Sequence, residues 1–499
     1  MSFNLASMLR ESALAKPDLP FVRFAGQSLT FQQLDKDSGR VASALLAHGL
    51  RPGDRVAVQI NNRPEFLQAY FGVLKAGLVM VPMNPMFKAG EIGHLLRDSQ
   101  ARMIITIGMC LPEIAQAGVS DDLTVCCVDE VDAPVLPFAD LLAGPATDDI
   151  AATEPQDTAV IIYTSGTTGR PKGAELSHFL LYMNCTISGE LFEVEDGDVT
   201  LAVLPFFHVY GLSGMVNVAV RYGGTLAVVP RYDPALIFDT MESEGVTIFV
   251  GVPTMYYGLL HADTGGRDLS RFRIASSGGA SMPGAVMAAF EQKFGAPIVE
   301  GYGLSESGST ALMNRPADRR ELSIGKPIWG VQAKVAGPDG EQLPPGAEHV
   351  GEILLKGHNI MKGYFGDQQA TGEALRDGWL HTGDLGYRDA DGFFFIVDRI
   401  KDLIIRGGYN VYPREVEEVL YTHPSIAEAA VIGRPDERLG EEVVAVVAPK
   451  PGAELDPDEI LAYCRERLAS YKCPREVRVL DALPKTDTGK LLKRELRKL

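Results

Sequence analysis

The feature that most restricts the fold is a repeated alternation between short apolar runs rich in Val and Ile and longer segments of helical periodicity. RVAVQI at 55–60 is followed by an amphipathic segment at 63–77 and then by LVMVPM at 78–83. Later runs of the same kind are TLAVV, TIFVGV and RFRIASS. This alternation is typical of α/β folds whose largely parallel strands are buried on both faces. It predicts a large N-terminal α/β domain of mixed or parallel sheets with flanking helices.

The pattern changes twice along the chain. Between about Lys334 and Phe395, short strands separated by turn residues predict an antiparallel, β-rich subdomain. From Arg399 onward, a bend with two glycines precedes alternating strands and helices, which predicts a small, compact α+β module. We therefore expect an N-terminal domain over 1–398 and a C-terminal domain over 399–499.

Charge is distributed unevenly between these parts. The whole chain carries 47 basic and 65 acidic residues, whereas 461–499 carry 11 basic and 5 acidic residues. The net charge of −18 argues against a protein that binds nucleic acid or anionic membranes through bulk charge. A basic C-terminal end suits a module that closes over an anionic ligand, although a solvated basic helix face would give the same composition.

The cysteines and the hydropathy of the sequence indicate in which cellular compartment the protein is located. The six cysteines include no C-x-x-C pair, so neither a zinc site nor a disulfide framework is suggested. No window of 18 uncharged apolar residues is present, and the N-terminus lacks the apolar core of a signal peptide. We expect a cytoplasmic protein with no transmembrane segment.

The strongest chemical motif is YTSGTTGRPKG at 163–173, directly after an apolar strand. Glycines allow backbone N–H groups to approach an anion, hydroxyls donate to phosphate oxygens, and a lysine adds a positive charge. The spacing differs from a Walker A loop, because Arg170 and Pro171 separate Gly169 from Lys172. The predicted phosphate-binding residues are Thr164, Ser165, Gly166, Thr167, Thr168, Gly169 and Lys172.

This loop closely resembles the phosphate-loop signature of the adenylate-forming superfamily. Four more stretches resemble that family's motifs in the same order: EGYGLSE at 300–306, WLHTGD at 379–384, DRIKD at 398–402 and PKTDTGK at 484–490. The resemblance covers nearly the whole chain and is nearest to acyl-CoA synthetases, most like bacterial fatty-acid–CoA ligases, with 4-coumarate–CoA ligases close.

The resemblance implies roles for the nucleotide-binding residues. Tyr302 would stack on adenine, and Ser305 would contact the α-phosphate or the acyl carboxylate. Asp384 and Arg399 would bind the ribose. The rest of the second motif, Glu300, Gly301 and Gly303, would line the ATP site. Thr164 and Glu306 would hold Mg²⁺, a hard cation that prefers oxygen ligands.

Catalytic roles are implied in the same way. Lys490 would stabilise the transition state at the α-phosphate, and Lys401 would be the hinge about which the C-terminal domain turns. His208 would lie between the acyl pocket and the thiol tunnel. Other acyl-pocket residues would be Tyr210, Gly278, Gly279 and Ala280. Arg406, Gly407 and Gly408 would line the path of the CoA pantetheine arm.

Together these motifs predict an AMP-forming acid–CoA ligase that uses ATP, Mg²⁺ and CoA. A carboxylate attacks ATP to give acyl-AMP and pyrophosphate, and the CoA thiol then displaces AMP. The acyl region offers no cation for a second carboxylate and no Asp for an α-ammonium group, which favours a medium- or long-chain fatty acid. The alternatives are an aryl acid of the cinnamate or coumarate type, a carrier protein as acyl acceptor, and an inactive ligand sensor.

Overall fold

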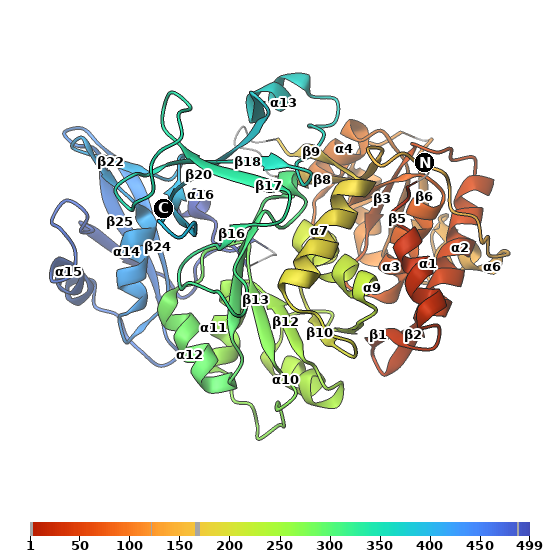
Figure 1. Ribbon diagram of the computed structural model, residues 1–499, viewed down its shortest axis with the longest axis horizontal. Helices are drawn as coiled ribbons and strands as arrows, with labels where there is room; N and C mark the ends of the chain where they lie inside the picture. Colours follow the sequence, from red (N-terminus) through yellow and green to blue (C-terminus); the bar gives the residue numbers. More distant parts are fainter. Residues whose placement is uncertain (1–2, 121, 165–169, 487–488) are drawn as a thin grey trace.

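The structure is a computed structural model that describes residues 3–120, 122–164, 170–486 and 489–499. Four β-sheets with flanking helices form the molecule. In Figure 1 the C-terminal sheet lies at the opposite end of the molecule from strands β3, β5 and β6 of the first sheet. The predicted α/β class, with a large N-terminal part and a smaller C-terminal part, is confirmed.

The first sheet has seven strands in the order β7-β6-β5-β3-β4-β8-β9, and only β8 and β9 pair antiparallel. Its parallel strands are the Val- and Ile-rich runs that the alternation predicts. The strands are β3 (Arg55–Gln59), β4 (Val79–Pro82), β5 (Ala101–Thr106), β6 (Thr124–Cys127), β7 (Leu136–Pro137), β8 (Thr158–Thr164) and β9 (Lys172–Ser177). The helices between them are α2 (Phe31–Ala47), α3 (Pro64–Lys75), α4 (Ala89–Asp98), η1 (Gly108–Cys110), α5 (Leu111–Gln116) and α6 (Phe138–Ala143).

The second sheet has nine strands in the order β16-β15-β14-β13-β12-β10-β11-β1-β2, with a parallel centre. Its strands are β1 (Pro20–Phe24), β2 (Gln27–Thr30), β10 (Val199–Ala202), β11 (Thr225–Val228), β12 (Ile248–Gly251), β13 (Ile274–Ser277), β14 (Ile298–Tyr302), β15 (Leu312–Met313) and β16 (Lys326–Pro327). The associated helices are α1 (Ser7–Ala15), α7 (His178–Leu191), α8 (Val209–Gly211), the π-helix η2 (Leu212–Asn217), α9 (Val218–Tyr222), α10 (Pro234–Ser243), α11 (Pro253–His261), α12 (Gly284–Phe294) and η3 (Ser305–Ser307).

The third sheet is the predicted β-rich subdomain, and its described pairings are antiparallel. It contains β17 (Val331–Ala336), β18 (Gly351–Gly357), β19 (Leu375–Arg376), β20 (Trp379–Arg388) and β21 (Phe394–Arg399), with the helix α13 (Gln368–Ala374). Strand β21 ends at Arg399, and the next sheet begins at Ile404. The domain boundary predicted at 398/399 falls at this transition and stays a prediction.

The fourth sheet forms the C-terminal module. It contains β22 (Ile404–Arg406), β23 (Tyr409–Val411), β24 (Ile426–Asp436), β25 (Gly440–Pro449) and β26 (Glu476–Val479), with helices α14 (Pro413–Tyr421), α15 (Pro457–Arg465) and α16 (Lys493–Leu496). The segment predicted as a bend at Gly407 and Gly408 is instead the turn of the β22–β23 hairpin. Both glycines have positive φ, at 58° and 84°, which a tight two-residue hairpin turn requires.

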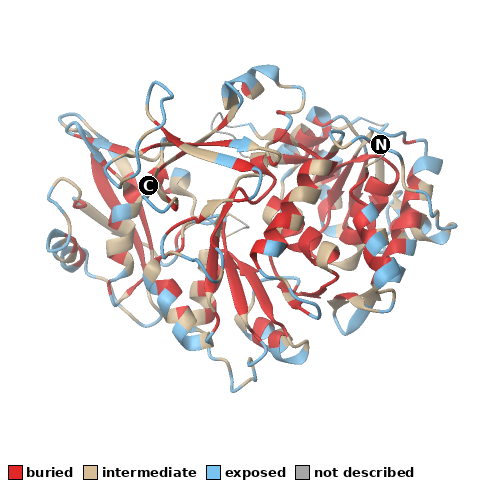
Figure 2. Ribbon diagram, viewed as in Figure 1, coloured by how far each residue is buried: buried red, intermediate tan, exposed pale blue. Residues whose placement is uncertain are grey.

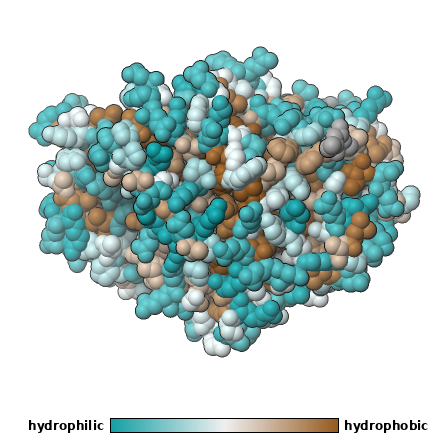
Figure 3. Space-filling view, viewed as in Figure 1, coloured by the Kyte–Doolittle hydropathy of each residue, from teal (hydrophilic) through white to brown (hydrophobic). Residues whose placement is uncertain are grey.

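The hydrophobic core follows the sheets. One large cluster of buried apolar side chains runs through the first three sheets, and two smaller clusters lie on the two faces of the C-terminal sheet. Figure 2 shows the strands buried and the loops exposed, and Figure 3 shows hydrophilic side chains over most of the same face. Over the part of the chain that the structure describes, no helix combines the length and apolar character that crossing a bilayer requires.

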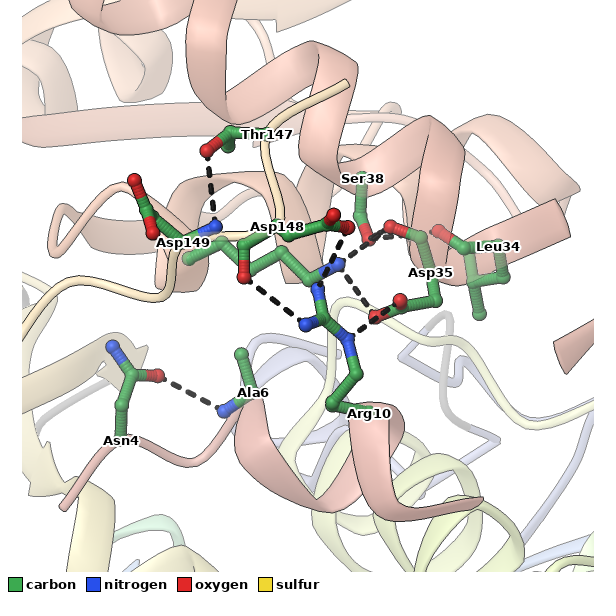
Figure 4. Close-up of polar contacts among 10 residues, drawn as sticks. Asn4, Ala6, Arg10, Leu34, Asp35, Ser38, Thr147, Asp148 and Asp149 are labelled. Carbon is green, nitrogen blue, oxygen red and sulfur yellow. Dashed lines mark hydrogen bonds and ion pairs between the residues drawn. The ribbon is translucent and has the colours of Figure 1, made fainter. Parts of the chain in front are cut away.

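A charged contact ties the first helices together (Figure 4). Asp35 on α2 accepts from Arg10 Nε of α1 and from Lys75 Nζ of α3, both at 2.7 Å. Arg10 also donates to the backbone carbonyl of Asp148 at 3.0 Å. The Lys75 side chain is fully buried, and burial lowers its pKa. One carboxylate therefore joins three helices at the edge of the first sheet.

Candidate active site

A cavity of about 870 Å³ lies between the large domain and the end of the C-terminal module. Much of its wall comes from residues that follow β10, β12, β13 and β14 at their carboxyl ends, where ligand sites of α/β sheets form. The predicted site residues on this wall are Thr164, Lys172, His208, Tyr210, Gly278, Gly279, Ala280, Gly301, Tyr302, Gly303, Ser305, Glu306, Arg399, Lys401 and Lys490. Motifs up to 326 residues apart in the sequence thus meet in one cavity.

Tyr302, Asp384 and Arg399 form a hydrogen-bonded group beside this cavity. The Tyr302 hydroxyl donates to Asp384 Oδ2 at 2.6 Å, and Arg399 Nε pairs with Asp384 Oδ1 at 2.9 Å. The β20–β21 register places Asp384 opposite Arg399, so the backbone itself brings the pair together. Asp384 is 3% exposed, and its negative charge raises the pKa of Arg399. A carboxylate held in this way has lone pairs left to accept hydrogen bonds from ligand hydroxyls.

Thr164 and Glu306 approach each other from two different sheets. The Thr164 hydroxyl donates to Glu306 Oε1 at 3.3 Å, and the Tyr364 hydroxyl donates to the same oxygen at 2.9 Å. Lys172 Nζ lies 5.4 Å from the centre of the Tyr364 ring. Glu306 is thus a carboxylate oriented by two hydroxyl groups, one of them on a ring that Lys172 approaches.

These oxygens fit a Mg²⁺ ion that is coordinated largely by its substrate. Among the described residues, no group of three or more His, Cys, Asp or Glu side chains could hold a metal alone. Mg²⁺ in nucleotide enzymes is typically bound through one or two carboxylates together with substrate phosphates and water. Glu306 and Thr164 would supply the protein oxygens of such a site.

Lys490 reaches the cavity from the last loop of the C-terminal module. Its side chain is exposed to the open cavity that it lines. Removal from bulk water, followed by the charge of Arg399, lowers the pKa of Lys490 to about 8. Lys401 is the next cation nearby, and its own pKa is lowered by burial and by Arg399. This concentration of positive charge matches an anionic ligand such as a phosphate chain.

His208 lies close to Lys490 on the opposite wall. Burial and then the charge of Lys490 lower the pKa of His208 to about 4, so the imidazole is neutral at pH 7. His208 Nδ1 accepts the backbone N–H of Tyr210 at 3.3 Å, which assigns the proton to Nε2. A neutral imidazole can donate or accept one hydrogen bond but cannot neutralise an anion.

The acyl-side wall is made of small and apolar groups around Tyr210. The Tyr210 hydroxyl contacts Ser276 Oγ at 3.0 Å, and its ring lies between two glycines. A Cβ at Gly214 would lie 2.9 Å from the ring, and one at Gly278 would lie 3.1 Å from it. The π-helix η2 follows the short helix α8 that carries Tyr210, and π-helical turns frequently occur at functional sites.

A second cavity of about 630 Å³ lies between the large domain and helix α14, and two predicted nucleotide-binding residues line this cavity but not the first one. They are Asp384 and Glu300. Glu300 is 3% exposed, and its Oε1 accepts the backbone N–H of Met282 at 3.1 Å. Burial raises the pKa of Glu300 to about 7. The Glu300 side chain thus lies behind Tyr302 and away from the first cavity.

The predicted CoA residues are not brought together with Lys490. Arg406 is buried in the C-terminal module, where its Nε pairs with Glu442 at 2.5 Å and its Nη1 donates to the Tyr471 carbonyl at 2.9 Å. Gly407 and Gly408 form the exposed hairpin turn and line neither cavity. The predicted phosphate-loop residues Ser165, Gly166, Thr167, Thr168 and Gly169 lie outside the described residues.

Sequence reasoning did not single out Tyr364, Val252 or Thr254. Tyr364 contacts Glu306 from a turn that carries no signal of its own. Val252 and Thr254 directly follow β12, and the rule that ligands bind at the carboxyl ends of parallel strands could have indicated them.

Comparison with known proteins identifies the family. The family model "AMP-binding enzyme" matches residues 9–365, and "AMP-binding enzyme C-terminal domain" matches residues 415–490. The chain belongs to the AMP-binding enzyme family. It is an AMP-forming acid–CoA ligase, with a small carboxylic acid, ATP and CoA as substrates and Mg²⁺ as the metal of its ATP site.

Several relatives cover nearly the full length of this ligase. It is 38% identical to a long-chain-fatty-acid–CoA ligase of Bacillus subtilis (99% of this chain and 94% of that one) and 39% identical to a feruloyl-CoA synthase of Amycolatopsis sp (99% of each). ATP-bound MatB from Rhodopseudomonas palustris is 33% identical, with a TM-score of 0.91 over 100% of this chain and 99% of that one. Apo MatB, at the same identity and coverage, gives a TM-score of 0.81. The ligase therefore resembles the ATP-bound arrangement more than the apo arrangement.

Proposed function

We propose that this ligase activates a medium- or long-chain fatty acid. The observation that carries the proposal is the composition of the acyl-side wall: the described stretches 204–210, 276–280 and 301–313 contribute neither Lys nor Arg to the cavity. His208, on the same wall, is neutral at pH 7. A second carboxylate or a sulfonate would therefore be buried without a counter-charge, at a cost of several kcal/mol. An apolar monocarboxylate meets no such cost, and the similarity to a fatty-acid–CoA ligase supports an alkyl chain.

The nucleotide half of the site suits the first half-reaction. In this proposal Tyr302 stacks on adenine, Asp384 and Arg399 accept and donate hydrogen bonds at the ribose, and Ser305 contacts the α-phosphate. Lys172 binds phosphate oxygens. Mg²⁺ on Thr164 and Glu306 would neutralise charge on the departing pyrophosphate.

Lys490 provides the catalytic charge in this step. The substrate carboxylate attacks the α-phosphorus, the bond to pyrophosphate breaks, and negative charge accumulates on the α-phosphate oxygens. A preorganised ammonium group stabilises that charge. Burial and then the charges of Arg399 and Lys401 lower the pKa of Lys490, and an anionic ligand would raise it again.

The second half-reaction needs another arrangement of the C-terminal module. We propose that 399–499 rotate about Lys401, withdraw Lys490 and bring the hairpin of Gly407 and Gly408 to the cavity. Arg406 would then act by holding the hairpin in shape through Glu442. The two TM-scores for MatB support such a difference between arrangements within the family.

An aryl acid is the second candidate. The feruloyl-CoA synthase relative supports it, and the aromatic ring of Tyr210 lines the cavity on its acyl side. We also propose a cytoplasmic location, where ATP and CoA are available and where the six cysteines, all free and buried, stay reduced.

The test is ATP- and Mg²⁺-dependent consumption of CoA thiol with a panel of acids. Octanoate and palmitate should be consumed best if the acid is a fatty acid, whereas a maximum with cinnamate or ferulate would establish the aryl alternative. Malonate serves as the dicarboxylate control and should be the poorest substrate. Pyrophosphate release without loss of CoA thiol would indicate a carrier protein as the acceptor.

A further inference from the structure

We propose that Thr254 is a positioning residue that holds the Lys490 loop against the large domain during adenylation. The proposal rests on the two-step function proposed above. It assigns a role to a side chain at the start of helix α11, outside all of the motifs that the sequence singled out. Thr254 itself is not expected to touch substrate.

The contact joins the two parts of the molecule one residue away from Lys490. Thr254 Oγ1 donates a hydrogen bond to the backbone carbonyl of Gly489 at 3.2 Å. Thr254 belongs to the first turn of α11, which is anchored at the carboxyl end of β12. The bond therefore joins the carboxyl end of β12, a central strand of the nine-stranded sheet, to the peptide unit that links Gly489 to Lys490.

Among the described contacts, the Thr254 hydroxyl makes its hydrogen bond to Gly489 and none to its own helix. The N-cap residue of α11 is Val252, which makes no side-chain capping hydrogen bond. A threonine near the start of a helix commonly caps the backbone. Here its printed hydrogen bond goes to the other module instead.

The shape of the Lys490 loop matches this contact. Gly489 has φ +80°, and a Cβ at that position would lie 2.4 Å from Thr254 Oγ1 and 3.1 Å from a Val252 methyl carbon. Any larger residue would therefore both strain the backbone and separate the two surfaces. Glycine at 489 allows the loop to lie directly on the first turn of α11.

Two hydrogen bonds between Thr486 and Lys490 link described residues on either side of the Lys490 loop. The Lys490 N–H donates to Thr486 Oγ1 at 3.0 Å, and the Thr486 N–H donates to the Lys490 carbonyl at 2.8 Å. At the base of the loop, Glu428 accepts the Leu483 N–H at 3.0 Å and pairs with the ammonium group of Lys485. Fixing Gly489 therefore fixes the direction in which Lys490 enters the cavity.

The contact should matter for one half-reaction only. It exists in the arrangement that presents Lys490 to the cavity, and the rotation proposed for thioester formation would break it. A general structural role for Thr254 would affect both half-reactions equally. This difference makes the proposal testable.

The first experiment compares Thr254→Val, which keeps the shape and removes the hydroxyl, with Thr254→Ser, which keeps the hydroxyl. We expect Thr254→Val to slow acid-dependent ATP–pyrophosphate exchange by about 3- to 10-fold, the range for loss of one hydrogen bond. Thioester formation from supplied acyl-AMP and CoA should stay within twofold of the unsubstituted enzyme, and Thr254→Ser should restore exchange. Unchanged exchange, or equal losses in both half-reactions, would overturn the proposal.

The second experiment needs no identified acid. Amide hydrogen exchange of the peptide covering 485–492 is followed with ATP and Mg²⁺ as the only ligands. Faster exchange in Thr254→Val than in the unsubstituted enzyme and in Thr254→Ser supports the role of Thr254, and equal exchange in all three overturns it. If no acid supports pyrophosphate exchange in the unsubstituted enzyme, the proposed function fails, while the amide measurement still decides the role of Thr254.

Discussion

At the scale of single residues, the ionisation of Lys490 governs what the active-site cavity can do. Its ammonium group shares the cavity with Arg399 and Lys401, and the neighbouring His208 is neutral. Positive charges placed close together are costly until an anion arrives. The free enzyme is therefore prepared for a highly charged ligand, although Asp384 and Asp402 already offset part of the positive charge around Lys490.

Replacement of Lys490 by alanine should affect adenylation selectively. We expect acid-dependent ATP–pyrophosphate exchange to fall by about 10²- to 10³-fold, the effect of removing one preorganised transition-state donor. Thioester formation from supplied acyl-AMP should be largely retained. Lys498→Ala is the matched control, since Lys498 lies in the same tail and pairs only with Glu495 in the described contacts. Equal losses in both half-reactions would contradict the proposal that Lys490 acts in adenylation and not in thioester formation.

The pH dependence of adenylation should report the same lysine. Lys490 acts as a cation, so its contribution is present below its pKa of about 8 and is lost as pH rises through that value. We expect kcat/KM for pyrophosphate exchange, which reflects the free enzyme, to decrease above about pH 8. In Lys490→Arg any residual activity should lack this decrease, because arginine stays protonated. A profile that is flat to pH 9.5 in the unsubstituted enzyme would refute the assignment.

At the scale of secondary-structure elements, helices α1, α2 and α3 depend on the carboxylate of Asp35. The two cations that it accepts differ in exposure: the Lys75 side chain is 0% exposed, whereas that of Arg10 is 23% exposed. Loss of the carboxylate leaves Lys75 Nζ with the backbone carbonyl of Asp35 at 2.5 Å and leaves Arg10 with Asp148. Loss of Lys75 leaves the Arg10–Asp35 pair in place at 2.7 Å.

Asp35→Asn should therefore destabilise the protein more than Lys75→Met does. We expect about 3 kcal/mol for Asp35→Asn, because a buried cation loses its counter-charge, and about 1 kcal/mol for Lys75→Met, which substitutes an apolar chain of similar length. Urea midpoints of the first unfolding transition would measure the difference. A larger loss in Lys75→Met would mean that the lysine itself, rather than the carboxylate, holds the helices together.

The elements also show what the sequence could predict. The Val- and Ile-rich runs became buried parallel strands because their apolar periodicity leaves no polar face to expose. The glycines at 407 and 408 were interpreted as a bend, since a strand of three residues such as β22 is too short to give a periodic signal. Its pairing partner β25 lies more than 30 residues away, and such non-local pairing is not encoded in a local window.

The same limit applies to the active site. The motifs containing Thr164, Tyr302, Asp384 and Lys490 were predicted individually, and their convergence on one cavity follows from the family resemblance. The roles of Tyr364 and Thr254 depend on side-chain contacts between separate sheets. Single hydroxyls at these positions have no pattern in the sequence that would distinguish them from ordinary surface residues.

At the scale of the whole molecule, the two-step function proposed above makes the position of the C-terminal module decide which half-reaction the enzyme can perform. The described arrangement presents Lys490 to the cavity and leaves the β22–β23 hairpin outside it. Thioester formation would require the reverse. Because Gly408 has φ +84° and open space around its Cβ position, a substitution there changes the hairpin surface more than the packing of the module.

Gly408→Phe should reduce CoA transfer by at least about 10-fold, because a ring would obstruct the thiol path and the backbone would be strained. Pyrophosphate exchange should change less than twofold. Gly452→Phe is the matched control, since Gly452 also has a positive φ (+78°) and open space, but lies in a different turn of the same module. Parallel losses of both half-reactions in Gly408→Phe would remove the hairpin from the thiol path.

The contacts of Glu306 have a consequence for engineering the enzyme by recombination. Glu306 lies between β14 and β15 of the nine-stranded sheet, Thr164 ends β8 of the seven-stranded sheet, and Tyr364 precedes α13 of the β-rich subdomain. In a hybrid that takes one of these three residues from a different parent, the carboxylate would contact a side chain from the other enzyme. Libraries of hybrid ligases made from this chain should therefore keep Thr164, Glu306 and Tyr364 from one parent, and exchange the acyl-side segments around Tyr210 and Gly278 instead.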